Sequence, residues 1–132
     1  MNDNLHTLVA LVEDKPGVLN RVASLFRRRS FNIESINVGH TEQPAFSRMT
    51  IVVNGDAPMV EQVEKQLRKV IEVVRVTDIT HEQIVARELA LMKVRATPAT
   101  RSEIIQIVDI FRANIVEVAA DSVFVEVTGD ED

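Results

Sequence analysis

The sequence contains no cysteine, no tryptophan and no tyrosine. Without cysteine, the chain forms no disulfide and offers no thiolate as a nucleophile or a metal ligand. Without tryptophan and tyrosine, the hydrophobic core has to be built from aliphatic side chains and five phenylalanines. The three histidines, His6, His40 and His81, are far apart, and none belongs to an i, i+4 pair of ligands. The residue types therefore give no support to a metal site.

The chain also lacks a long hydrophobic run. No apolar segment approaches the roughly 20 residues that a membrane-spanning helix needs. The first residues, Met1-Asn2-Asp3-Asn4, are polar and contain no apolar core of a signal peptide. We therefore expect no membrane association and a cytoplasmic location.

Positive charge is in deficit, with 15 Lys and Arg against 20 Asp and Glu and a net charge of -5. An acidic chain is a poor partner for nucleic acid, because the phosphates repel it. The one basic run is Arg27-Arg28-Arg29. It is typical of the solvated C-terminal end of a helix, where cations complement the helix dipole. A contact with a phosphate or a partner protein is the alternative interpretation of this run.

Residues 1–80 follow the pattern β-α-β-β-α-β. Two amphipathic stripes predict helices; they consist of Leu19, Val22, Ala23 and Phe26, and of Val60, Val63, Leu67, Val70 and Ile71. Apolar or alternating runs predict strands at 5–12, 33–38, 47–53 and 73–79. This order defines the ferredoxin-like arrangement of the α+β class, with both helices on one face of a four-stranded sheet.

Residues 81–132 begin the same pattern again. A strand pattern at 87–96 precedes a helical stripe, and two further strand patterns follow at 115–119 and 123–128. The stripe consists of Ile104, Ile107, Val108 and Phe111. We expect a second, incomplete ferredoxin-like βαββ unit, whose apolar surface something has to cover. A shortened chain and completion by another chain are both open.

The turn from the first strand into the first helix is the candidate functional site. Gly17 lets the backbone approach a ligand, and the N–H groups near Gly17, Val18 and Leu19 are suited to a carboxylate. Asp14 could accept an ammonium group, and Asn32 begins the second strand, which we expect beside the first. Together these groups would recognise a free α-amino acid. The alternative is that they are ordinary turn and strand-entry residues.

An enzyme of the acylphosphatase type, which shares this fold, is the competing prediction. Such an enzyme holds a phosphate in this loop with an arginine. Here the loop is Glu13-Asp14-Lys15, which is net acidic and contains no arginine, so a phosphate would be repelled. No spacing links a nucleophile to a base anywhere in the chain. We therefore expect no catalytic activity.

The sequence then resembles a known family in five ordered motifs. They are Pro16-Gly17-Val18-Leu19-Asn20-Arg21-Val22, Phe31-Asn32-Ile33-Glu34-Ser35, Ser47-Arg48-Met49-Thr50-Ile51, Glu64-Lys65-Gln66-Leu67 and Arg87-Glu88-Leu89-Ala90-Leu91. The chain looks like an ACT domain, the small-molecule-sensing version of the ferredoxin-like fold. More specifically, it is similar to the small regulatory subunits of acetohydroxyacid (acetolactate) synthase, over nearly its whole length.

The resemblance implies a homodimer that pairs two ACT sheets edge to edge and binds valine or a related branched-chain amino acid at the interface. Carried over by position, the effector site comprises Asp14, Gly17, Val18, Leu19 and Asn32, with Asn20, Gly39 and Gln62 as further candidates. The implied partner is the large catalytic subunit, which carries thiamine diphosphate, magnesium and FAD. This chain would bind none of these cofactors itself.

Two points remain open at the level of the sequence. The family commonly has asparagine where this chain has Asp14, so effector affinity or selectivity is expected to differ. Two other functions also fit the pattern. One is a stand-alone ACT-type sensor that regulates a different enzyme or a transcription factor. The other is a dimerisation module with an empty pocket.

Overall fold

A computed structural model describes residues 4–130 of the chain. Contacts divide it into two compact units, one ending at Gln83 and the other beginning at Ile84. Each unit has its own cluster of buried hydrophobic residues. Residues 1–3 and 131–132 belong to the domains expected from the sequence but lie outside the described part.

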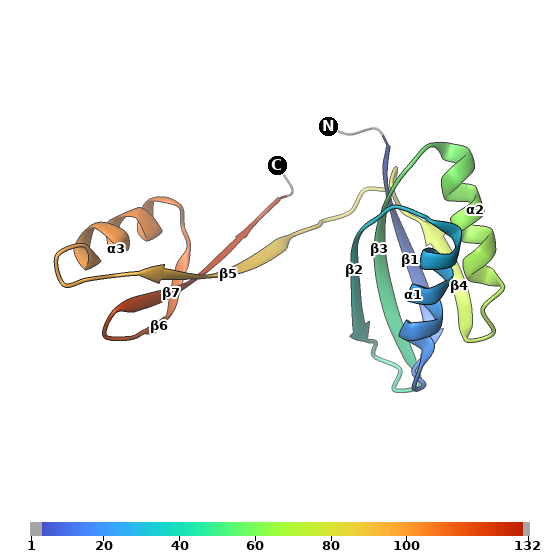
Figure 1. Cartoon of the computed structure of the whole chain (residues 1–132), viewed down its shortest axis with the longest axis horizontal. Helices are drawn as coiled ribbons and strands as arrows, with labels where there is room; N and C mark the ends of the chain where they lie inside the picture. Colours follow the sequence, from blue (N-terminus) through green and yellow to red (C-terminus); the bar gives the residue numbers. More distant parts are fainter. Residues whose placement is uncertain (1–3, 131–132) are drawn as a thin grey trace. The chain divides into compact units, whose positions relative to one another are not determined.

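The first unit is a four-stranded antiparallel sheet covered on one face by two helices (Figure 1). Its elements are β1 (Leu5–Glu13), α1 (Val18–Arg29), β2 (Ile33–His40), β3 (Phe46–Asn54), α2 (Ala57–Arg68) and β4 (Val73–Asp78). The strand order is β2-β3-β1-β4. The ferredoxin-like prediction for this part of the chain is therefore confirmed.

The neighbours of β2 differ from the sequence-based expectation. The expectation that the second strand lies beside the first is wrong, because β3 lies between β1 and β2 and pairs with both. A helix is about 10 Å wide, whereas neighbouring strands are about 4.8 Å apart. The crossover through α1 therefore leaves room for one more strand. β3, which follows β2 after a short loop, occupies that space.

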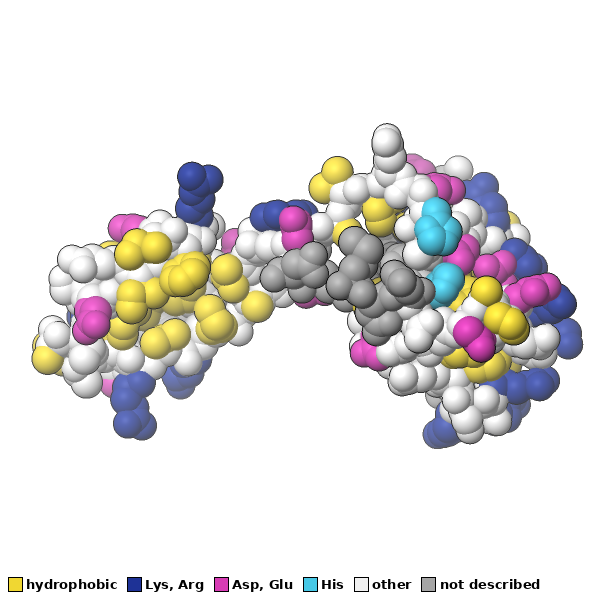
Figure 2. Space-filling model, turned by 90° about the horizontal axis from the view of Figure 1, so that it is seen from above, with side chains coloured by type: hydrophobic (Ala, Val, Ile, Leu, Met, Phe, Trp, Pro, Cys, Tyr) yellow, Lys and Arg dark blue, Asp and Glu magenta, His cyan; other side chains and the backbone are white. Residues whose placement is uncertain are grey.

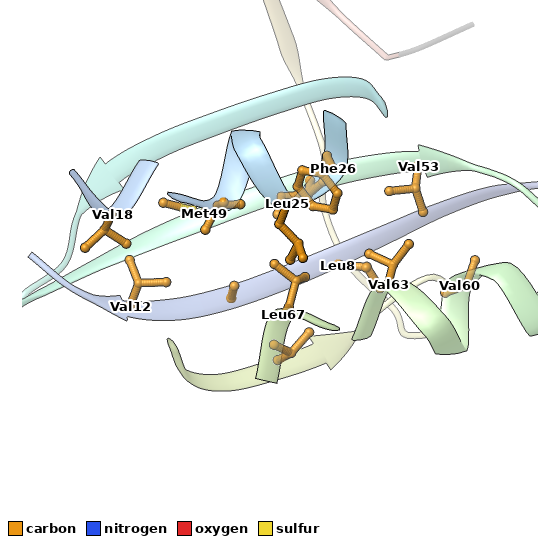
Figure 3. Packing of buried hydrophobic residues seen from close by; sticks show 14 residues of the cluster. Leu8, Val12, Val18, Leu25, Phe26, Met49, Val53, Val60, Val63 and Leu67 are labelled. Atoms are coloured by element: carbon orange, nitrogen blue, oxygen red, sulfur yellow. The ribbon is translucent and has the colours of Figure 1, made fainter. Parts of the chain in front are cut away.

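The core of the first unit lies between the sheet and its two helices (Figure 3). Along β1 the side chains alternate, so Leu8, Ala10 and Val12 are fully or almost fully buried against the helices. Helix α1 contributes Val22 and helix α2 contributes Leu67, neither of which is exposed to solvent. The core therefore forms where the alternate side chains of the strands pack against the apolar stripes of the helices.

Helix α2 begins as expected and ends sooner than expected. The side chain of Asp56 caps it by accepting a hydrogen bond from the Met59 N–H at 3.0 Å. The helix ends at Arg68, and Val70 turns back to donate its N–H to the Leu67 carbonyl at 3.0 Å. The prediction that Ile71 continues the buried stripe is wrong, because Ile71 lies beyond the helix and is 92% exposed.

The second unit is a three-stranded antiparallel sheet with one helix. Its elements are β5 (Glu88–Arg95), α3 (Arg101–Ile110), β6 (Asn114–Val118) and β7 (Ser122–Gly129), and the strand order is β5-β7-β6. The βαββ order expected for this unit is confirmed. Its buried core is small and consists of Ala96, Val108, Val123 and Val125.

An apolar groove of about 490 Å³ runs between α3 and the sheet of the second unit. Met92, Val125 and Val127 line it from the strands. The helical stripe expected to be buried is only partly covered here, since Ile107 and Phe111 remain exposed. Figure 2 shows hydrophobic side chains gathered on the surface of this unit.

A polar network fastens the residues after β4 to β1. The Thr80 hydroxyl accepts the Thr7 N–H at 3.0 Å, and the Ile79 N–H donates to the Thr7 carbonyl at 2.9 Å. The Asp78 carboxylate accepts hydrogen bonds from the hydroxyl and the N–H of Thr80, and it lies 3.3 Å from His6 Nδ1. Burial alone would raise the pKa of Asp78, but these partners stabilise its charged form and the net effect lowers the pKa below 3.8.

Asp78→Asn is expected to make stability less sensitive to acid. Because the folded-state pKa of Asp78 is lowered, its carboxylate stabilises the fold above the unfolded-state pKa. That contribution is lost as the pH falls through the lower pKa of the folded state. Unfolding by urea between pH 7 and pH 3 should show a shallower decline for the variant than for the wild type. Asp109→Asn, at an exposed position, is the control; an equal change there would contradict the prediction.

Candidate functional site

The loop between β1 and α1 has a backbone that requires glycine. Gly17 is the N-cap of α1 and adopts φ 85°, in the left-handed region that side chains disfavour. A Cβ atom at this position would lie 3.3 Å from Nη1 of Arg21. The loop therefore needs glycine for its conformation and for the close approach of Arg21.

The start of α1 offers unpaired backbone donors. The Val18 N–H reaches the Lys15 carbonyl at 3.4 Å, a long contact. Among the described residues, the N–H groups of Gly17, Leu19 and Asn20 take part in no hydrogen bond, and no side chain caps this helix. Free N–H groups and the positive end of a helix dipole favour an anion. Buried Val18 anchors this turn to the core.

Asp14 lies at the same end of the sheet as this helix start. Its N–H donates to the Ala45 carbonyl at 2.8 Å, which holds the loop against the β2–β3 connection. Its carboxylate lies 3.5 Å from Nδ1 of His40, the last residue of β2. Asp14 is exposed, so its carboxylate is accessible to a ligand. This region therefore contains both backbone N–H groups that can donate to a carboxylate and the Asp14 carboxylate, which can accept from an ammonium group.

Asn32 lies at the opposite end of the sheet. Its carbonyl accepts the N–H of Asn54, and the next residue, Ile33, pairs with Val53 at the far end of β3. Glu13, which precedes Asp14, pairs with Phe46 at the near end. Seven residues of strand separate the two positions along β3, or about 23 Å. One chain therefore does not bring Asn32 and Asp14 together.

The three further candidates occupy different places. Gly39 lies in β2 beside His40 and opposite Arg48, at the same end of the sheet as Asp14. Asn20 is exposed on α1, directly after the unpaired N–H groups. Gln62 is exposed on α2 and, among the described residues, forms no hydrogen bond with any other candidate.

Two neighbours of the site were not predicted from the sequence. His40 contacts Asp14 only because the β2–β3 hairpin brings the end of β2 to the end of β1. Arg21 lies over Gly17 and forms an ion pair with Glu72, more than 50 residues further along the chain. The pairing register of β2 with β3 would have indicated that His40 lies near Asp14. Nothing in the local sequence indicates that Glu72 pairs with Arg21.

None of the helices between residues 4 and 130 has both the length and the hydrophobicity of a membrane-spanning helix. The same residues contain no group of three or more His, Asp or Glu side chains that could hold a metal ion.

The two-helix, four-stranded ferredoxin-like unit, with a glycine at the start of its first helix, has the architecture of an ACT domain. A family profile described as "AHAS small subunit-like ACT domain" matches residues 8–75, and one described as "Small subunit of acetolactate synthase" matches residues 87–132. The chain belongs to the acetolactate synthase small-subunit family. The ACT domain of a GTP pyrophosphokinase from Chlorobium tepidum shares the fold, with a TM-score of 0.53 over 64% of this chain and 96% of that one.

Individual relatives agree with this assignment. A probable acetolactate synthase small subunit from Archaeoglobus fulgidus is 61% identical over 96% of this chain and 79% of its own length. An acetolactate synthase small subunit from Mycobacterium avium is 52% identical over 98% of this chain and 78% of its own. The crystal structure of the small subunit from Thermotoga maritima matches with a TM-score of 0.88 and 46% identity, over 96% of this chain and 80% of that one. Membership of this family points to a regulatory subunit that associates with a catalytic large subunit.

Proposed function

We propose that this chain is a non-catalytic regulatory subunit that binds valine or a related branched-chain amino acid and thereby inhibits the catalytic subunit of acetolactate synthase. In the absence of the effector it activates that subunit. Family membership and the paired anion and cation sites around Gly17 support the proposal. The family's function also implies that the protein works in the cytoplasm.

The separation of Asn32 from Asp14 supports an effector site shared by two copies of the chain. Strand β2 is at the edge of the sheet, so its outer backbone groups are available for pairing. Its side chains are largely exposed, including Ile36 at 38% and Val38 at 46%. An antiparallel pair of β2 strands about a twofold axis places the start of one opposite the end of the other. Asn32 of one copy then lies beside Asp14 and Gly17 of its partner.

In this arrangement each ligand group has a chemical counterpart. The N–H groups of Gly17, Leu19 and Asn20 hold the carboxylate, and the carboxylate of Asp14 holds the ammonium group. The amide oxygen of Asn32 from the other copy accepts a second hydrogen bond from the ammonium group. The apolar side chain packs against Leu19, which is 47% exposed in the single chain.

Catalysis belongs to the large subunit in this proposal. That subunit binds thiamine diphosphate, magnesium and FAD, and the small subunit binds none of them. Inhibition requires that the effector prefer the inhibited state of the complex, by a coupling free energy of typically about 1–3 kcal/mol. By reciprocity, binding of the large subunit changes the affinity for the effector by the same factor.

Asn32→Ala is expected to weaken valine binding by about 10- to 100-fold, because a hydrogen bond to a charged group contributes about 1.5–3 kcal/mol. Isothermal titration of the wild-type chain with L-valine should show saturable binding, with D-valine as the stereochemical control. Asn114→Ala, an exposed asparagine at the start of β6, is the matched variant and should bind like the wild type. Equal affinity of the wild type and Asn32→Ala would remove Asn32 from the site, and no heat with any branched-chain amino acid would contradict the sensing function.

A further inference from the structure

We propose that the helix-covered face of the first unit binds an acidic protein surface on the catalytic subunit, through an open cationic groove between α1 and the end of α2. This inference rests on the proposed function, which supplies the partner. The groove has a volume of about 560 Å³ and is lined by side chains from α1 and from residues 69–72. The lining consists of three cations, one carboxylate, two aliphatic and two polar residues: Arg21, Arg28, Lys69, Glu72, Val70, Ile71, Asn20 and Ser24.

Positive charge is concentrated on these helices although the chain as a whole is acidic. Helix α1 carries four arginines and no acidic residue. Together with α2 and the residues up to Glu72, this layer holds seven Lys and Arg against three glutamates, whereas the whole chain has 15 against 20. Figure 2 shows Lys and Arg side chains gathered along one edge of the first unit. The helix layer is therefore positive on a protein that is otherwise negative.

Of the three cations that line the groove, Arg21 is paired with Glu72, whereas Arg28 and Lys69 are not neutralised by any described residue. Elsewhere in the layer, Lys65 pairs with Glu61 at 3.2 Å and Arg68 with Glu64 at 3.1 Å. Arg28 and Lys69, by contrast, form no ion pair and no side-chain hydrogen bond with any described residue. The groove thus presents two free positive charges beside the ion pair of Arg21 with Glu72.

Helix dipoles explain part of this pattern but not all of it. Cations near the C-terminal ends of helices are favourable by about 0.3–1 kcal/mol each, which accounts for Arg28 in the last turn of α1. The same effect does not explain Ile71, an isoleucine that is 92% exposed at the groove. An exposed branched aliphatic side chain in a groove that also carries two unpaired cations offers a protein partner an apolar contact with a polar rim.

The charge distribution also selects the kind of partner. A nucleic acid or another extended polyanion would cross from the positive layer onto the acidic remainder of the chain. Each of its phosphates that lies within the screening length of about 8–10 Å of the acidic surface would be repelled there. An acidic patch of limited size on a folded protein matches the layer without this penalty. Such a patch needs carboxylates opposite Arg28 and Lys69 and an apolar socket for Ile71.

The test measures binding of the full chain to the purified catalytic subunit. The double charge reversal Arg28→Glu with Lys69→Glu is expected to weaken binding by about tenfold or more and to reduce its dependence on salt concentration. Ile71→Ser is expected to weaken binding by about three- to tenfold, with an unchanged unfolding temperature because the side chain is exposed. Arg48→Glu with Arg75→Glu, on the uncovered face of the same sheet, changes the net charge equally. This control should bind within about twofold of the wild type.

The possible outcomes distinguish failure of the docking surface from failure of the proposed function. Binding of the wild type together with normal binding of both groove variants would overturn the docking surface and leave the regulatory function intact. If the control pair Arg48→Glu with Arg75→Glu weakened binding to the catalytic subunit equally, that result would also overturn the docking surface and leave the regulatory function intact. Failure of the wild type to bind the catalytic subunit would overturn both. Saturable binding of inorganic pyrophosphate that is lost in the groove double variant, with unchanged subunit association, would assign the groove to a small anion instead.

Discussion

Gly17→Asp is expected to abolish the response to valine, with a loss of affinity of at least about 100-fold. The new carboxylate would stand where the effector's carboxylate binds, so two like charges would share one set of N–H donors. The residue would also be held at φ 85°, which costs a side-chain-bearing residue about 1–3 kcal/mol. Calorimetric titration with L-valine and inhibition of the reconstituted synthase would both measure the loss.

A matched variant distinguishes this effect from a general loss of stability. Gly129→Asp makes the same chemical change in the second unit, where an added Cβ would meet no atom within 4 Å. That variant should keep its valine affinity. If Gly17→Asp still binds valine like the wild type while folding normally, the carboxylate does not sit at the start of α1.

Mixing variants tests whether the site is shared between two copies. In a mixed dimer of Gly17→Asp and Asn32→Ala, the loop of one copy and the asparagine of the other are both intact at one site. Random exchange of subunits should therefore restore about a quarter of the wild-type number of full-affinity binding sites, although Gly17→Asp alone lacks them and Asn32→Ala alone binds about 10- to 100-fold more weakly. A site contained in one chain predicts no restoration.

Leu67→Ala is expected to lower the free energy of unfolding of the first unit by about 2–5 kcal/mol. Leu67 is fully buried between α2 and the sheet, in the same cluster as Leu8 and Val63 (Figure 3). Truncation removes apolar contacts and leaves a cavity that the close-packed neighbours cannot fill. Urea unfolding followed by circular dichroism measures the change.

Ile71→Ala, four residues further on, is the corresponding control. Because Ile71 is 92% exposed, this change should alter stability by less than about 0.5 kcal/mol. Similar losses for the two variants would mean that Ile71 is buried in solution and that the end of α2 is placed differently. The pair thus tests the helix boundary as well as the core.

The elements of the fold were predictable because their side-chain patterns are local. The apolar run of β1, the alternation along β3 and the stripe on α1 each arise within a dozen residues. The end of α2 was not predictable in the same way. Val70 and Ile71 both fit the helical period, and only the turn at Lys69, which leads the chain into β4, places Ile71 in solvent. Tertiary packing decided that boundary.

Some features of the candidate site are likewise local and were predictable, whereas others depend on tertiary structure. The turn before α1 and the helix start were predictable, because turn residues and an apolar stripe are local features, whereas the left-handed conformation of Gly17 came from the structure. The relation of Asn32 to Asp14 depends on strand order, which side-chain periodicity does not encode. The expectation of neighbouring strands came from the ferredoxin-like pattern, whereas β3 separates those strands and the two residues lie at opposite ends of the sheet.

The far edge of the sheet has a consequence for how large an assembly can grow. Strand β4 has only six residues, and its register with β1 shifts between Leu11 and Val12. Arg75 points from this edge strand on the face that the helices leave open. Short, irregular and charged edge strands resist further pairing. In the proposed dimer, pairing through β2 would therefore close after two copies, and the edge at β4 would prevent growth into an endless ribbon of sheets.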